Sequence, residues 1–134
     1  MNQKQVKHVV AGLIFHEGKL FAAARNENDD RFGKFEFPGG KIEPNETPKE
    51  ALRREILEEL AMDIVVGDLF MHVSHDYPTF QLEMDVFIAT TEDPSFSLFV
   101  HQSAGFYTKD DILKLPFLGA DIKIVHKIRQ YLMF

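Results

Sequence analysis

Residues 40–62 read GKIEPNETPKEALRREILEELAM, the most informative segment of the chain. Thr47, Pro48 and Glu50 supply a helix N-cap, a first-turn proline and the glutamate of a capping box. A helix is therefore predicted to begin at Thr47. A turn with two glycines precedes it at residues 38–40, where the absence of glycine side chains allows the backbone to approach the acidic face of the helix closely.

The predicted helix has two chemically different flanks. At about 3.6 residues per turn, Glu55, Glu58 and Glu59 project from one face. Glu50, Arg54 and Glu58 follow at i, i+4 intervals and can pair to orient the carboxylates. A charged run is often only a solvated face, but hard divalent cations prefer such oxygen ligands. The opposite flank carries apolar side chains that can pack on a sheet: Leu52, Ile56 and Leu60, widened by Leu57.

The charged residues also stand at a known spacing. Gly40, Glu46, Arg54, Glu55, Glu58 and Glu59, with Ile56 and Met62 at apolar positions, match G-x5-E-x7-R-E-U-x-E-E-x-G-U. The chain therefore resembles the Nudix hydrolase family, whose box this is. Ala61 stands where the pattern has glycine. A left-handed helix-ending residue with a Cβ costs roughly 1 to 2 kcal/mol, so we expect local strain or a shifted helix end there.

Residues 35–43, FEFPGGKIE, are similar to the W/L-E-F-P-G-G-K-x-E segment of the MutT-type members. The resemblance extends over residues 9–131. It implies a single Nudix domain over residues 1–134 that hydrolyses a nucleoside triphosphate to monophosphate and pyrophosphate. The implied chemistry is attack of a metal-activated water on the phosphate chain.

The resemblance also implies roles for individual residues. Glu58, Glu59 and the Gly39 carbonyl are expected to hold Mg²⁺, or Mn²⁺. Glu55 is expected to be a ligand, the general base, or both. Arg54 is expected to orient the neighbouring glutamates through charge-assisted hydrogen bonds. Glu46 is expected to lie across the turn and to act as a brace or an outer-shell ligand.

Substrate contacts are predicted outside the box. Arg25 and Lys41 flank the glycine turn and are candidates for clamping phosphate. Asp121 lies in an Ala-Asp-Ile segment that resembles the base-reading segment of cytidine-triphosphate-type members; its carboxylate can accept a hydrogen bond from the cytosine amino group. The alternative for Asp121 is a plain helix N-cap. Phe37 and Phe80 are candidates for stacking on the base, with a place in the core as the alternative.

Three functions follow as hypotheses. The first is hydrolysis of CTP, dCTP or a modified cytosine nucleotide. The second is removal of oxidised nucleotides such as 8-oxo-dGTP, and the third is a non-catalytic nucleotide sensor or adaptor. Val100 stands where many MutT-type members have a further acidic residue, which leaves the number of metal ions open. His101, Glu92 and Asp93 are the nearby groups that can compensate.

The rest of the chain predicts an α/β fold of the Nudix type, an α/β/α sandwich with a mixed, partly antiparallel sheet. A polar loop is expected at 26–34, and an antiparallel pair is joined by the turn 74–79. Strands are predicted at 6–15, 19–25, 35–37, 41–43, 64–73 and 80–90, and further helices from Thr108 and over 122–132.

Composition agrees with one domain. The chain has 134 residues, 45% apolar content and thirteen phenylalanines, enough for one core. No apolar run is long enough to span a membrane and the start lacks a secretion signal, so a cytoplasmic location without membrane partners is expected. A net charge of −6 argues against nucleic acid polymers as partners. The absence of cysteine excludes disulfides and thiolate sites, and both a monomer and a homodimer remain open.

Overall fold

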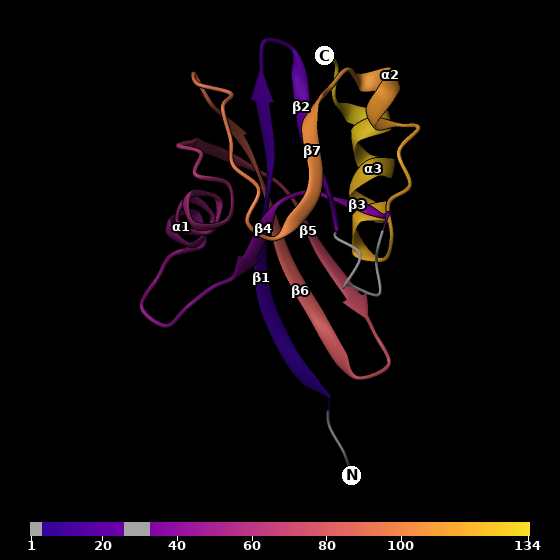
Figure 1. The fold of residues 1–134 in the computed structure, drawn as a ribbon. Coiled ribbons are helices and arrows are strands. Elements are labelled where there is room, and N and C mark those ends of the chain that lie inside the picture. Colours follow the sequence, from indigo (N-terminus) through magenta and orange to yellow (C-terminus); the bar gives the residue numbers. More distant parts are fainter. Residues whose placement is uncertain (1–3, 26–32) are drawn as a thin grey trace.

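A mixed sheet lies between helices in the computed structural model, which describes residues 4–25 and 33–134 of the chain (Figure 1). The elements in chain order are β1 (Gln5–His16), β2 (Lys19–Arg25), β3 (Phe35–Glu36), β4 (Gly39–Lys41), α1 (Pro48–Leu60), β5 (Val65–Asp76), β6 (Phe80–Thr90), β7 (His101–Tyr107), α2 (Lys109–Ile112) and α3 (Ala120–Tyr131). The strand order is β3-β2-β1-β6-β5, with β4 paired to β1 and β7 paired to β2. Only the β1–β6 pair of this described sheet is parallel. The predicted mixed α/β fold is confirmed.

The central strands bury both faces, so the molecule has a core on each side of the sheet. Successive side chains of a strand point to opposite faces, and β1 and β2 follow this alternation. In Figure 1, α1 and α3 accordingly lie on opposite sides of the strands. The cluster under α1 includes Val10, Ile14, Phe21, Leu52, Ile56 and Leu60, and the cluster under α3 includes Ala11, Leu13, Ala22, Val73, Ile124 and Ile128.

Helix α1 begins and ends as the sequence predicts. The Thr47 hydroxyl accepts a hydrogen bond from the Glu50 N–H at 3.1 Å, and a Glu50 carboxylate oxygen accepts one from the Thr47 N–H at 2.8 Å. At the other end Ala61 adopts the left-handed conformation, with φ of 53°, and its N–H donates to the Leu57 carbonyl. Of the two outcomes expected at Ala61, the structure shows the strained, left-handed residue and not a shifted helix end.

Several boundaries differ from the prediction. Strand β4 includes both glycines, because Gly39 and Gly40 pair with β1 instead of forming a turn outside the sheet. Strand β5 continues to Asp76, because its last residues still pair with β6. Strand β7 was not predicted, and α3 begins two residues early, at Ala120. Most of the predicted polar loop, residues 26–32, lies outside the described residues.

The helices also test the prediction that the chain does not span a membrane. Within residues 4–25 and 33–134, every helix is too short or too polar to cross a membrane.

Candidate active site

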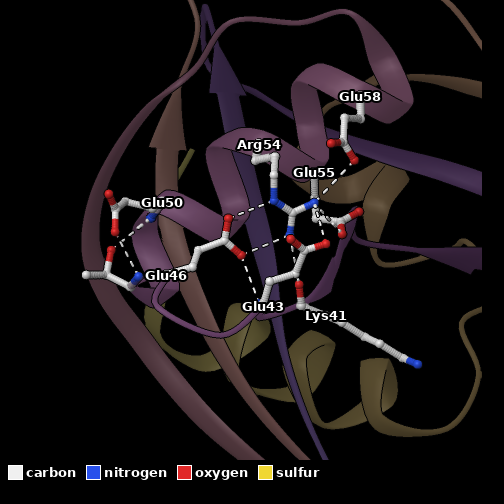
Figure 2. A network of polar contacts seen from close by, with 8 residues as sticks. Lys41, Glu43, Glu46, Glu50, Arg54, Glu55 and Glu58 are labelled. Carbon is white, nitrogen blue, oxygen red and sulfur yellow. Dashed lines mark hydrogen bonds and ion pairs between the residues drawn. The ribbon is translucent and has the colours of Figure 1, made fainter.

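Arg54 lies at the centre of a group of carboxylates on α1 and the preceding turn (Figure 2). Its Nε and Nη2 donate to the two oxygens of Glu46 at 2.7 and 2.9 Å, a bidentate pair. Its Nη1 donates to Glu55 Oε1 at 3.1 Å and to Glu58 Oε2 at 3.2 Å. The Lys41 carbonyl accepts a further hydrogen bond from Nη2 at 3.1 Å. One guanidinium therefore fixes the turn and two of the glutamates of α1 relative to one another.

The electrostatics follow from these contacts. The hydrogen bonds from Arg54, together with one from the Glu43 backbone N–H, lower the pKa of the Glu46 carboxyl to about 2. The same pairing raises the pKa of Arg54. Both groups are thus charged throughout the neutral range, and Glu46 acts as a brace for the arginine.

The two glycines of β4 allow the sheet to approach the acidic helix. A Cβ on Gly40 would lie 2.4 Å from the Glu55 carboxyl carbon, so this carboxylate packs directly on the glycine backbone. A Cβ on Gly39 would lie 1.8 Å from the Val10 carbonyl oxygen of the neighbouring strand. These two contacts explain why this strand requires two consecutive glycines.

Glu59 is the carboxylate of α1 with the least favourable surroundings. Burial above all, together with repulsion from Glu55, raises its pKa to about 7. Glu36 also raises this pKa, whereas His101 and Arg25 lower it. A cation bound to this face would relieve the cost of the Glu59 charge.

The raised pKa of Glu59 predicts a pH-dependent stability of the metal-free protein. The folded carboxyl titrates near 7 and the unfolded one near 4.5, so this group's stabilising contribution is complete below about pH 4.5 and is lost as the pH rises through 7. Glu59→Gln removes the ionisation. Its Tm in the presence of a chelator should match that of the wild type at pH 4 and exceed it at pH 8. Glu58→Gln, on the same helix, is the matched control; an equal gain in both variants would contradict this origin.

A second polar network lies on the strands beside α1. The Arg25 Nε donates to Glu36 Oε1 at 2.9 Å, and the His101 Nε2 lies 2.9 Å from Glu36 Oε2. The His101 side chain is fully buried. His101 is therefore held inside the sheet by Glu36, next to Val100, where the sequence pattern leads one to expect an acidic group. Sequence reasoning named the histidine but missed its partner Glu36.

A cleft of about 660 Å³ opens beside the glycine turn. It brings together the predicted substrate residues, which come from five different segments: Arg25, Phe37, Lys41, Phe80 and Asp121, together with Gly39. Its wall also carries two lysines that sequence reasoning did not select, Lys7 and Lys34. None of the described lining residues comes from α1. The acidic face of α1, formed by Glu55, Glu58 and Glu59, therefore borders the cleft through Gly40, which contacts Glu55.

The aromatic residues and Asp121 are more constrained than the sequence indicates. Phe37 is 4% exposed and stacks on Phe117, with ring centroids 4.8 Å apart. Phe80 stacks on Tyr77 at 4.8 Å. Asp121 is the second residue of α3, and the N-cap is Gly119. The N-cap interpretation of Asp121 is therefore wrong, because the N-cap lies two residues earlier, at Gly119.

The carboxylates of the acidic face can serve as oxygen ligands, but they do not converge on one point. Among the residues that the structure describes, no three His, Asp or Glu side chains are grouped closely enough to hold a metal ion. Glu55 and Glu58 are instead hydrogen-bonded to Arg54. The donor chemistry nevertheless fits a hard divalent cation, because carboxylates repel one another here and raise the pKa of Glu59.

Comparison with known proteins identifies this arrangement. The sequence pattern of the NUDIX domain matches residues 9–127. The chain belongs to the Nudix family. It is 38% identical to an 8-oxo-dGTP diphosphatase of Proteus vulgaris over 67% of this chain and 81% of that protein. It is 29% identical to a CTP pyrophosphohydrolase of Escherichia coli over 87% of each chain.

Solved Nudix structures agree with the fold. The crystal structure of a MutT protein from Methanosarcina mazei superposes with a TM-score of 0.83 and 27% identity, over 97% of this chain and 98% of that one. The predicted MutT-type resemblance and the predicted enzyme class are confirmed: the chain is a Nudix pyrophosphohydrolase. Nudix hydrolases generally use divalent metal ions, in keeping with the carboxylates of α1. The two relatives carry the names of both substrate classes that the sequence predicts.

Proposed function

We propose that this Nudix enzyme hydrolyses a nucleoside triphosphate, CTP or dCTP in first place, to the monophosphate and pyrophosphate. The observation that carries the proposal is the charge of the cleft. In a protein of net charge −6, the lining of this cleft carries four basic side chains, Lys7, Arg25, Lys34 and Lys41, against two carboxylates, Glu36 and Asp121. Such a concentration of positive charge favours a polyanionic ligand.

The acidic face of α1 supports the catalytic part of the proposal. The Gly39 carbonyl, Glu55, Glu58 and Glu59 would hold the divalent metal, Mg²⁺ or Mn²⁺. Bound there, the ion supplies neutralisation of charge on the phosphoryl oxygens and a lower pKa for a coordinated water. Arg54 keeps Glu55 and Glu58 in fixed orientations, and Glu46 fixes Arg54 in turn.

The chemical step needs a base for the attacking water. We assign this role to Glu55, whose carboxylate is held by Arg54 and by the Gly40 backbone. The water oxygen forms a bond to phosphorus, the P–O bond between the α- and β-phosphates breaks, and the water proton passes to Glu55. Arg25 and Lys41 bind the phosphates and so balance the charge of the leaving pyrophosphate.

Asp121 supports cytosine as the base. Asp121 is one of the residues that line the cleft, and a carboxylate can accept a hydrogen bond from the exocyclic amino group of cytosine. Uracil presents a carbonyl at that position and would be repelled. The alternative, an oxidised purine such as 8-oxo-dGTP, is favoured by the name of the 38% identical Proteus vulgaris relative.

Asp121→Asn should lower kcat/KM for CTP by about tenfold, because a neutral amide accepts the amino hydrogen bond more weakly. Turnover of CTP, dCTP, UTP, dGTP and 8-oxo-dGTP with Mg²⁺ measures this selectivity. The matched control is Asp110→Asn, the same change at an exposed residue of α2. A wild-type preference for 8-oxo-dGTP would support the alternative, and an Asp121→Asn variant with an unchanged CTP to UTP ratio would contradict the cytosine assignment.

A further inference from the structure

The turn between β5 and β6 contacts the first turn of α3 at one wall of the cleft. The Tyr77 hydroxyl oxygen accepts a hydrogen bond from the Ala120 N–H at 3.1 Å. Ala120 is the first residue of α3, and its N-cap, Gly119, has no side chain to cap the helix. The tyrosine thus supplies, from another part of the chain, an acceptor for one of the N–H groups that a helix N-terminus leaves unpaired.

Gly119 allows the hydroxyl to come this close. The glycine has a φ of 61°, and a Cβ at this position would lie 2.4 Å from the Tyr77 oxygen. A side chain would therefore be strained and would also displace the phenol. Two independent features of Gly119, its backbone conformation and the space above it, are matched to the tyrosine.

Tyr77 is itself held firmly in the turn. Its ring stacks on Phe80, with centroids 4.8 Å apart and an interplanar angle of 24°. Its N–H donates to the Phe80 carbonyl at 2.9 Å, and its carbonyl accepts from the Lys4 ammonium at 2.8 Å. A second link joins strand β5, just before this turn, to α3, because Lys123 of α3 donates to the Ser74 carbonyl at 2.7 Å. The end of β5, the turn and the start of α3 therefore form one connected wall.

This wall belongs to the cleft in which we propose that the nucleotide binds. Tyr77, Phe80, Gly119, Ala120 and Asp121 all line it. Asp121 follows Ala120, whose N–H is bound by the Tyr77 hydroxyl. The hydroxyl therefore determines the position of the first turn of α3, and with it the position of Asp121 relative to the ligand. A displacement of about 1 Å in a contacting group is enough to cost substantial recognition.

We propose that Tyr77 is a positioning residue for base selection, whose hydroxyl fixes the segment 119–121 against the nucleobase. The inference rests on the proposed nucleotide hydrolysis. It assigns selectivity to a residue that touches the base-contacting segment through a backbone N–H, and it separates this role from the acidic face of α1, where the chemistry takes place.

Tyr77→Phe tests the inference because it keeps the ring and removes only the acceptor. We expect KM for the preferred triphosphate to rise about threefold to tenfold, the worth of one hydrogen bond, with kcat unchanged. The discrimination between that triphosphate and its closest base analogue, CTP against UTP or 8-oxo-dGTP against dGTP, should shrink. The control is Tyr131→Phe, which removes a hydroxyl from an exposed tyrosine of α3. An unchanged selectivity, or an equal loss of kcat on every triphosphate, would overturn the inference.

A binding measurement separates this inference from the proposed reaction. Calorimetric titration with CMP, UMP, 8-oxo-dGMP and dGMP reports base selection without turnover. If the wild type hydrolyses no triphosphate, the proposed reaction fails, and reduced discrimination among these monophosphates by Tyr77→Phe still supports the positioning role. Equal discrimination by the wild type and Tyr77→Phe, or a wild type that binds none of the four, overturns it.

Discussion

Glu55→Gln is expected to lower kcat by about 10²- to 10⁴-fold, the range over which a positioned general base acts. The amide has the size of the carboxylate, and its oxygen can still accept the 3.1 Å hydrogen bond from Arg54. It cannot take the proton of the attacking water or contribute negative charge to a cation site. Pyrophosphate release at saturating triphosphate and Mg²⁺ measures the loss, and the Tm shows that the fold is retained.

The matched control for this variant is Glu17→Gln. Glu17 lies in the turn between β1 and β2, and its side chain is 84% exposed. This control should keep the wild-type rate. Full activity in both Glu55→Gln and Glu59→Gln would contradict the assignment of the acidic face of α1 as the catalytic centre.

Arg54→Gln should have the next largest effect, a fall in activity of about 10- to 100-fold together with a lower Tm. The guanidinium holds Glu46 in a bidentate pair and also binds Glu55 and Glu58. Without it, three carboxylates lose their common partner and repel one another. The neighbouring Arg53 provides the control: it is 65% exposed, pairs with Asp63 at 3.2 Å, and Arg53→Gln should change neither rate nor Tm appreciably.

The loss of stability in Arg54→Gln should depend on pH. The folded pKa of Glu46 is about 2 and the unfolded value is 4.5, so its pairing stabilises the protein above pH 4.5, and this contribution is lost as the pH falls toward 2. The Tm difference between wild type and Arg54→Gln should therefore be largest at neutral pH and shrink in acid. A difference that is constant from pH 7 to pH 3 would show that the arginine stabilises the fold in another way.

Local rules predict α1 well. Thr47, Pro48 and Glu50 determine its start through contacts within four residues, and they form the capping box that the sequence indicates. The same box explains why one predicted ion pair is replaced. The i, i+4 spacing pairs Arg54 with Glu50 as readily as with Glu58, but Glu50 turns its carboxylate to the Thr47 N–H, and Glu46 becomes the stronger partner of the arginine.

Long-range pairing accounts for what the sequence does not predict. Strand β7 contains Ser103 and Gly105, which interrupt the alternation of apolar residues, and it becomes a strand because it pairs with β2. The parallel register of β1 with β6 likewise pairs residues that are distant in sequence, such as Val9 and Met84. No periodicity within either strand encodes this register.

The residues of the cleft likewise divide into those that the local sequence reveals and those that only the three-dimensional structure brings together. Two basic residues of the cleft, Arg25 and Lys41, are recognisable from the sequence because they flank the two glycines. The wall that we propose to contact the base is assembled from distant segments, and the contact of Tyr77 with Ala120 requires the three-dimensional structure. Asp121 lines the cleft, and its contact with the base stays a prediction. Its place as the second residue of α3 follows from the N-cap at Gly119, which has a positive φ.

The products formed from CTP test the central claim most directly. The purified protein is incubated with CTP and Mg²⁺, and nucleotides and phosphates are separated and quantified, with Glu55→Gln alongside. The account predicts CMP and pyrophosphate in equal amounts from the wild type and almost none from the variant. Formation of CDP and orthophosphate, or equal turnover by wild type and Glu55→Gln, would contradict it.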